Sequence, residues 1–348
     1  MARYHINSKG EVAICTAKEN CPLGGQHFTN PNEAIHYADQ INEAVVSSKL
    51  PEDLARMEYI ERDIYRHKYN HDEAYSMQEA LKRGAFVEQR VEYARKVENL
   101  DTHNLYFDPD IDDYTPERKK LHDKLLREVL EKYKDVPCEG KVFMSGGISG
   151  AGKTTMLSRM GINLDNYATV SSDDFKELLA REGAIPEVSG LTPMEASSLV
   201  HEESSHLAER LLLNLANKKK NLIYDFTMKS EQTTMKRIVT LNGFGYQNKD
   251  IKLVFVDVPL TTSKDRAKTR YMTGLNNFDL GGRWLPAYVS DKQKAKTNLF
   301  NTVNAETVVS IGSKRESLGL PEPIIYDNSD NGIRVDFEEF KKGYRQWI

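Results

Sequence analysis

The feature that most constrains this chain is a glycine-rich loop that follows a short apolar run. The loop, residues 145–155, reads SGGISGAGKTT and comes directly after the apolar residues 142–144. It fits the pattern G-x-x-x-x-G-K-S/T, whose fixed positions are Gly147, Gly152, Lys153 and Thr154. Glycine lets the backbone turn its amide groups toward an anion, and the positive end of a following helix favours negative charge. The sequence therefore predicts a phosphate-binding loop between a strand and a helix.

This loop pattern is typical of nucleoside triphosphate sites. In it the lysine reaches the β and γ phosphates and the hydroxyl of the next residue ligates Mg²⁺, which assigns those roles to Lys153 and Thr154. The nucleotide-binding residues that we expect are Gly147, Ser149, Gly150, Ala151, Gly152, Lys153, Thr154 and Thr155. Either ATP or GTP would satisfy the loop as the phosphate donor.

Beyond residue 141, short apolar segments alternate with helix-forming ones. We expect strands at 142–144, 168–171, 221–225, 252–258, 306–310 and 324–326. Helices are expected to start at the loop, at Asp174, at Pro193 and at Ser230. This alternation predicts an α/β fold with a mostly parallel sheet that helices cover on both faces.

The first part of the chain has a different pattern. Residues 1–135 are expected to form a hairpin, from 4–6 and 12–14, followed by helices at 32–46, within 51–96 and at 116–133. Residues 136–348 would then form the α/β domain. Cys15, Cys21 and His27, with His5, raise the alternative of a zinc site, but their spacing fits no C-x2-C pair and favours plain thiols.

Composition narrows the class of protein. Of 348 residues, 39% are hydrophobic and 29% charged, which is enough apolar side chain for a folded core. The net charge of −4 disfavours a large nucleic-acid footprint. The chain contains no apolar run of signal-peptide or membrane-spanning length, and its three cysteines agree with a reducing compartment, so we expect a cytoplasmic protein.

The fate of the γ phosphate depends on the residues that follow the other strands. A GTPase needs N-K-x-D, and the nearest match, residues 248–250, has the wrong spacing. A motor ATPase needs paired acids, whereas NLIYDFT ends its apolar run in the single acid Asp225. A small-molecule kinase needs a carboxylate at the end of the strand beside the loop, to accept a proton from the attacking hydroxyl. Asp173 or Asp174, after the strand expected at 168–171, offers it.

Together these segments resemble the zeta-toxin family of P-loop kinases. The resemblance rests on the loop and on SSDDFK, VHEESSHLAERLL, NLIYDFT and DRAKTRYMTG, and it covers residues 141–328. It implies a P-loop kinase fold, ATP and Mg²⁺ as cofactors, toxicity, and a helical antitoxin partner. The best-known members phosphorylate the 3′-hydroxyl of UDP-N-acetylglucosamine, and others act on different hydroxyls, including one on NAD.

The resemblance also assigns roles to individual residues. Asp173 takes the place of the catalytic base, whereas Ser171 departs from the acid that the family has two positions earlier. An alternative for Asp173 is a plain N-cap of the helix expected at Asp174. Asp225 and Thr227 match the family's substrate- and metal-holding positions, although Phe226 replaces a glycine. For a substrate-contacting glutamate we favour Glu203 over Glu209.

Arginines supply the positive charge that phosphoryl transfer needs. By resemblance, Arg270 and Arg283 are the catalytic arginines, and Arg266 is expected to contact substrate. Arg266 and Arg270 are four residues apart, so a helix would point both the same way. The pair Gly281 and Gly282 suggests a hinge that lets Arg283 close over the nucleotide.

The sequence thus predicts a kinase that phosphorylates a hydroxyl of a nucleotide-containing small molecule such as UDP-N-acetylglucosamine or NAD. Two alternatives stay open: a polynucleotide 5′-hydroxyl kinase, and a nucleotide-dependent switch without turnover. The helical part, residues 1–135, would serve as scaffold, shape substrate choice, or restrain the enzyme in place of an antitoxin.

Overall fold

The computed structural model describes residues 3–6, 12–15, 27–28, 75–277 and 279–343. Strands β1 (Arg3–Ile6) and β2 (Val12–Cys15) pair antiparallel, which confirms the predicted hairpin strands, and β3 (His27–Phe28) pairs with β1 on its other side. The helices predicted at 32–46 and 51–74, and the side chains of the alternative zinc site, lie outside the described residues.

A six-stranded sheet forms the centre of the fold, with the strand order β11-β10-β9-β6-β8-β7. Five strands run parallel, and β11 lies antiparallel to β10 at one edge. Their bounds are β6 (Val142–Gly146), β7 (Ala168–Val170), β8 (Leu222–Asp225), β9 (Ile251–Asp257), β10 (Ile324–Asp327) and β11 (Ile333–Val335). The mostly parallel α/β sheet predicted from the alternating pattern is therefore confirmed.

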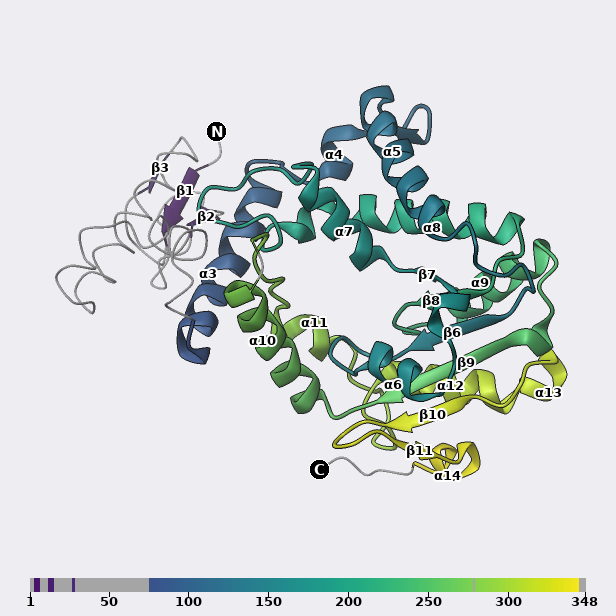
Figure 1. The fold of residues 1–348 in the computed structure, drawn as a ribbon. Helices are drawn as coiled ribbons and strands as arrows, with labels where there is room; N and C mark the ends of the chain where they lie inside the picture. The colour runs from purple at the N-terminus through teal and green to yellow at the C-terminus, as the bar shows by residue number, and fades with distance from the viewer. Residues whose placement is uncertain (1–2, 7–11, 16–26, 29–74, 278, 344–348) are drawn as a thin grey trace.

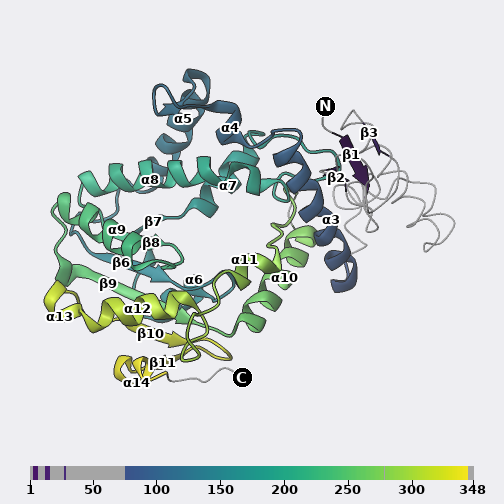
Figure 2. The same cartoon turned by 180° about the vertical axis from the view of Figure 1, so that it is seen from behind.

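Helices cover both faces of this sheet (Figures 1 and 2). On one face Phe143 and Ile223 pack with Leu157 of the helix that follows the loop, whereas alternate residues such as Met144 face the main core. The main helices of this part are α6 (Lys153–Arg159), α7 (Ser172–Arg181), α8 (His201–Asn217), α9 (Glu231–Gly243), α10 (Leu260–Asn277) and α12 (Val303–Ser313). Shorter ones are α11 (Ala287–Asp291), α13 (Arg315–Leu318) and α14 (Phe337–Lys341). None of the helices in the described ranges combines the length and apolar character that a membrane span requires.

Two predicted elements are wrong. The segment 306–310 belongs to helix α12 rather than to a strand, because its buried residues Ala305, Val308 and Ile311 recur every three positions. Thr302 caps this helix by accepting a hydrogen bond from the Ala305 amide at 3.2 Å. The helix expected at Pro193 is instead a turn over 193–196 and the 3₁₀ helix η2 (Ser197–Val200), after which α8 begins at His201.

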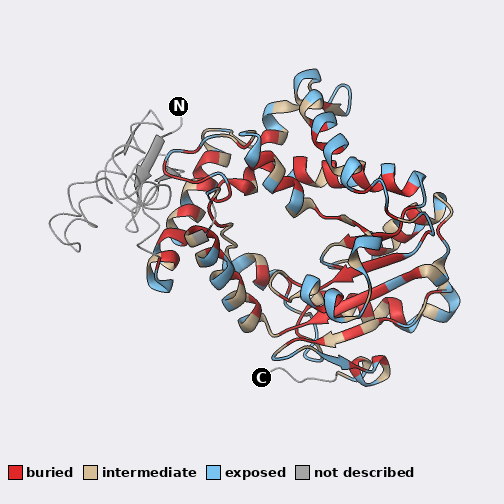
Figure 3. Ribbon diagram, in the orientation of Figure 1, coloured by how far each residue is buried: buried red, intermediate tan, exposed pale blue. Residues whose placement is uncertain are grey.

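The described part of the N-terminal region is helical, as predicted. It contains α3 (Met77–Lys96), α4 (Thr102–Tyr106), the short strands β4 (Phe107–Asp108) and β5 (Asp113–Tyr114), and α5 (Pro116–Lys132). Ser76 and Glu79 form a capping box at the start of α3. Val87 and Val91 of α3 and Leu125 of α5 belong to the same buried core as the sheet residues. Figure 3 shows buried residues both along α3 and along the strands of the sheet, and Figures 1 and 2 show α3 lying beside α10.

Candidate active site

The glycine-rich loop connects β6 to α6 at the carboxyl end of the sheet. Gly147 and Gly150 have φ angles of 137° and 77°, in the region that favours glycine. A Cβ at Gly147 would lie 2.6 Å from the carbonyl oxygen of Val256, and one at Gly150 would lie 2.7 Å from that of Ser263. Both positions therefore need glycine for space as well as for conformation. Helix α6 starts at Lys153, as predicted.

Lys153 lies beside a carboxylate at the end of the neighbouring strand. Its Nζ donates to the Gly147 carbonyl at 3.3 Å and lies 3.6 Å from Oδ1 of Asp225, the last residue of β8. The Ser145 hydroxyl donates to the same Oδ1 at 2.8 Å. The Thr154 hydroxyl and the Asp225 carboxylate both face the same cleft. Because Mg²⁺ prefers oxygen ligands and is usually held by one or two protein groups plus phosphate, these two residues fit a Mg²⁺–nucleotide.

Most of the predicted site residues line one cleft of about 1240 Å³. Those brought together there are Ser149, Gly150, Gly152, Lys153, Thr154, Thr155, Asp173, Asp225, Thr227, Arg266, Arg270 and Arg283. Gly147 and Ala151 belong to the loop but do not line the cleft. The Ala151 carbonyl accepts a hydrogen bond from Asn328 Nδ2 at 2.7 Å.

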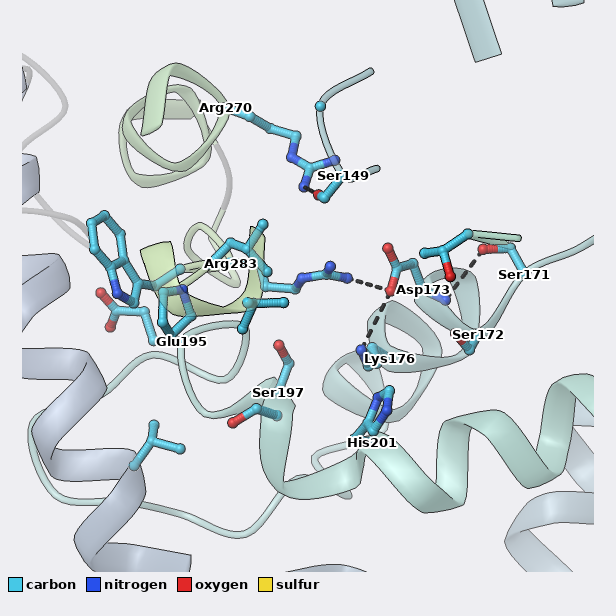
Figure 4. A pocket seen from close by; sticks show the side chains of 18 of the residues that line it. Ser149, Ser171, Ser172, Asp173, Lys176, Glu195, Ser197, His201, Arg270 and Arg283 are labelled. Atoms are coloured by element: carbon cyan, nitrogen blue, oxygen red, sulfur yellow. Dashed lines mark hydrogen bonds and ion pairs between the residues drawn. The ribbon is translucent and has the colours of Figure 1, made fainter. Parts of the chain in front are cut away.

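Asp173 faces positive charge inside the cleft (Figure 4). It forms ion pairs with Arg283 and, at 3.3 Å, with Lys176. Burial alone would raise the pKa of Asp173, but the two cations outweigh it and hold this pKa well below its usual range. Ser171 is the N-cap of α7 and accepts from the Asp173 amide, so the alternative of Asp173 as the cap is wrong. Asp174 is exposed and does not line the cleft.

The strand before Asp173 is not the direct neighbour of the loop strand, contrary to the prediction. Strand β8 lies between β6 and β7, so Asp225 ends the adjacent strand and Asp173 follows the edge strand. Strand order depends on how the crossovers wind, which the pattern of apolar residues does not encode. Both carboxylates still lie at the carboxyl end of the parallel strands, where ligands bind in open α/β sheets.

Helix α10 directs two arginines into the cleft, as the four-residue spacing predicted. Arg270 Nη2 donates to the Ser149 hydroxyl at 3.2 Å, which places this arginine against the loop. Arg266 Nη2 donates to the Asn328 carbonyl at 2.8 Å, next to the end of β10. The cleft therefore has a strongly cationic side built from α6, α10 and the segment that carries Arg283.

The two glycines before Arg283 are closely packed. A Cβ at Gly281 would lie 2.1 Å from the Thr192 hydroxyl, and one at Gly282 would lie 2.3 Å from the Tyr271 carbonyl. The Met194 amide donates to the Leu280 carbonyl at 2.9 Å. Both residues therefore need glycine for space, and Gly281 also has a φ of 79°; the hinge stays a prediction.

Glu203 does not line the cleft, contrary to the prediction. Its side chain is fully buried against α5, where Arg118 Nε donates to it at 2.6 Å and His122 Nε2 lies 2.7 Å from it. Burial would raise the pKa of Glu203, but these partners lower it to about 2. The alternative, Glu209, is exposed and also lies outside the cleft. The glutamate of α8 that lines the cleft is Glu202, the residue before Glu203.

Sequence reasoning missed the wall opposite the loop. This wall consists of residues from α3, η2, the start of α8 and the segment after Arg283: Val87, Glu88, Val91, Glu92, Arg95, Ser197, Ser198, His201, Glu202 and Trp284. The helical spacing of α3 indicated an amphipathic helix, but nothing in it distinguishes a face that packs on a core from one that borders a cleft.

Comparison with known proteins gives one family match and several similar solved structures. The family model described as zeta toxin matches residues 127–314, more than half of the chain. No curated protein matches the chain. A crystal structure of AvrRxo1-ORF1:AvrRxo1-ORF2 with sulphate ions is similar at 20% identity, over 67% of this chain and 75% of that one, with a TM-score of 0.46. The PezAT toxin-antitoxin system of Streptococcus pneumoniae is similar at 18% identity, over 64% and 82%, with a TM-score of 0.44. The match of the family model over more than half of the chain, including the glycine-rich loop, shows that the chain belongs to the zeta-toxin family of P-loop kinases.

Proposed function

We propose that this protein transfers the γ-phosphate of ATP, or of GTP, to a hydroxyl of a nucleotide-containing small molecule. UDP-N-acetylglucosamine, at its 3′-hydroxyl, and NAD are the acceptors to test first. The observation that carries the proposal is the position of Asp173 in one cleft with Lys153 and the arginines of α10. A carboxylate and a set of cations facing each other is what an attacking hydroxyl and a migrating phosphoryl group need.

On the donor side, the loop amides and Lys153 would hold the β and γ phosphates. Thr154 and Asp225 would hold Mg²⁺, which supplies charge neutralisation between the β and γ phosphates. Arg270 contacts the loop through the Ser149 hydroxyl, and Arg283 pairs with Asp173. Both would stabilise the negative charge that the oxygens of the γ-phosphoryl group carry during transfer.

On the acceptor side, Asp173 would act as the general base. The acceptor oxygen forms a bond to the γ-phosphorus, the bond from that phosphorus to the β–γ bridging oxygen breaks, and its electron pair stays on the nucleoside diphosphate. The proton of the acceptor hydroxyl passes to the Asp173 carboxylate. Arg283 and Lys176 hold this carboxylate in the ionised form that can take a proton, although the same ion pairs lower its basicity.

The charge of the opposite wall supports a small acceptor over a polynucleotide. Three carboxylates, of Glu88, Glu92 and Glu202, line that side of the cleft beside one arginine, Arg95. A strand of nucleic acid would place several phosphates beside these carboxylates, whereas nucleic-acid sites attract phosphate with cations. The polynucleotide alternative is therefore the weaker one. A switch without turnover would have no use for a carboxylate held ionised opposite the loop.

Membership of a toxin family leads us to propose that expression arrests growth and that a partner protein restrains the kinase in the cytoplasm. Residues 1–135 and 136–348 remain our proposed division of the chain. The competing proposal is that the N-terminal region, rather than a separate partner protein, restrains the kinase. A growth assay with wild type, Lys153→Ala and a chain lacking residues 1–74 compares them, because self-restraint predicts stronger arrest after the deletion.

Label transfer from γ-labelled ATP tests the proposed reaction. The wild type is incubated with UDP-N-acetylglucosamine, NAD, nucleosides and 5′-hydroxyl oligonucleotides in turn. We expect label on a nucleotide-containing small molecule. We expect none with Lys153→Ala, which removes the positive charge that Lys153 would place beside the β and γ phosphates. Label on the oligonucleotide alone would favour the polynucleotide kinase. Tight ATP binding with no labelled acceptor would contradict the kinase and favour the switch.

A further inference from the structure

A fully buried carboxylate, Glu195, lies behind the arginines of the cleft. Its two oxygens accept hydrogen bonds from Arg83 Nε and Arg83 Nη2, both at 2.7 Å, and from the Tyr271 hydroxyl at 2.6 Å. The Thr192 amide donates at 2.8 Å and its hydroxyl at 3.1 Å. We call Arg83, Thr192, Glu195 and Tyr271 the Glu195 cluster.

The Glu195 cluster joins three elements that are far apart in the sequence. Arg83 belongs to α3, Thr192 and Glu195 to the segment before η2, and Tyr271 to α10. Arg83 Nη2 also donates to the Gly190 carbonyl at 3.1 Å. Helix α3 lies outside the segment 127–314 that matches the family model. A buried carboxylate of the matched segment is thus neutralised by a residue from outside it.

The cluster adjoins the chain segments that carry both arginines that we assign to the transferred phosphate, and Glu195 itself borders the cleft. Tyr271 is the residue after Arg270 on α10. Arg283 stands between Gly282, which packs on the Tyr271 carbonyl, and Trp284, whose ring meets that of Tyr271 edge-on at 5.1 Å. On its other side the Trp284 ring packs on α3 so closely that a Cβ at Gly84 would lie 2.3 Å from it.

Such a cluster tolerates few alternative arrangements. A buried ion pair that loses one partner leaves an uncompensated charge. A buried hydrogen-bond network is most stable when every donor and acceptor in it has a partner. The side chains of Arg83 and Glu195 are 1% and 0% exposed, so water does not replace a lost partner. The arrangement of α3, α10 and the segment before η2 is therefore fixed at one point.

We propose that the Glu195 cluster positions Arg270 and Arg283 for phosphoryl transfer, which makes α3 part of the apparatus that sets the catalytic geometry. Glu195, Arg83 and Tyr271 are positioning residues in this proposal, because they act through the two arginines. The proposal rests on the proposed function, in which those arginines act on the γ-phosphoryl group.

The test uses Tyr271→Phe in the full chain, which keeps the ring and the Arg83–Glu195 pair and removes one hydrogen bond to Glu195. We expect kcat for label transfer to fall by about tenfold, because small misplacements of catalytic groups have large effects on rate. The KM for ATP should change by less than about twofold, since Lys153 and the loop still hold the nucleotide. Arg90→Met, which breaks the Arg90–Glu98 ion pair of the same α3 away from the cleft, should leave both constants at wild-type values.

A double-mutant cycle separates positioning from a loss of fold. In a chain that already carries Arg270→Gln and Arg283→Gln, Tyr271→Phe should cause no further fall in the residual rate. An equal fall in both backgrounds would overturn the proposal and show a general structural effect. Wild-type kcat in Tyr271→Phe would also overturn it, while leaving the proposed function intact. A wild type that binds ATP but labels no acceptor would instead remove the proposed function, and this proposal with it.

Discussion

At the scale of single residues, the cleft holds its charges in fixed states by pairing them. Asp173 is flanked by Arg283 and Lys176, and these cations lower its pKa in spite of burial. Glu203, on the far side of α8, is held by Arg118 and His122 in the same way. The two carboxylates differ in access: Asp173 faces the cleft, whereas Glu203 is sealed in the core. Pairing with cations therefore holds an accessible carboxylate in the cleft at one position and a buried carboxylate in the core at the other.

Glu203 makes the free energy of unfolding depend on pH in the acidic range. Its pKa falls from 4.5 to about 2 on folding, so it contributes stability above pH 4.5 that is lost as the pH falls toward 2. We expect Glu203→Gln to lower the free energy of unfolding at neutral pH by about 3 kcal/mol, because Arg118 loses its buried partner. The variant should also lose less stability than wild type on acidification from pH 4.5. Urea unfolding across this range measures both effects.

The exposed Glu209, on the same helix, provides the matched control for that experiment. Glu209→Gln should follow the wild-type curve at every pH. An acid dependence of Glu203→Gln that coincides with wild type would show that the buried pair contributes nothing to the pH profile.

At the scale of elements, the sequence predicted the helices and strands that follow from local residue patterns. It did not predict the features that depend on tertiary contacts, such as the strand order and the rotation of helices. The strands around 142–144 and 221–225 were recognisable as short apolar runs followed by polar residues. The segment 306–310, ETVVS, contains β-branched residues that favour a strand, and only its burial every three positions shows it to be a helix. The place of β8 between β6 and β7 depends on the crossovers. Neither Glu203 nor Glu209, the two candidates from the sequence, lines the cleft, because the rotation of α8 against α5 turns Glu202 toward it instead.

The contact between α3 and Trp284 gives a prediction at this scale. Gly84→Ala adds helix propensity of about 1 kcal/mol. Its Cβ, however, would lie 2.3 to 2.6 Å from three ring atoms of Trp284. The ring must move, and Arg283 beside it moves as well, so we expect lower kcat and a net loss of about 1–3 kcal/mol in unfolding free energy. Label transfer and thermal unfolding measure the two changes.

Gly243→Ala is the matched control for this substitution, because a Cβ there meets nothing within 4 Å. It should leave the activity unchanged and the unfolding free energy equal or higher. If Gly84→Ala behaves like Gly243→Ala, then the packing of Trp284 on α3 does not set the position of Arg283.

At the scale of the whole molecule, the described part of the N-terminal region is built into the kinase. Helix α3 supplies Val87, Val91 and Arg95 to the wall of the cleft and Arg83 to the Glu195 cluster. The pattern of residues 75–135 predicted helices but not this role, because the faces of an amphipathic helix do not reveal their partners. The boundary at residue 135 and restraint by the N-terminal region stay predictions.

The most direct test of the whole account is a single-turnover measurement with Asp173→Asn and the acceptor that wild type labels. Asn keeps the shape of the side chain but cannot take a proton, so transfer should fall by at least about 100-fold. ATP binding should persist, because Lys153 and the loop are untouched. The neighbouring Asp174→Asn, outside the cleft, should behave as wild type. Equal transfer by Asp173→Asn and wild type would contradict the central claim that this carboxylate accepts the proton of the attacking hydroxyl.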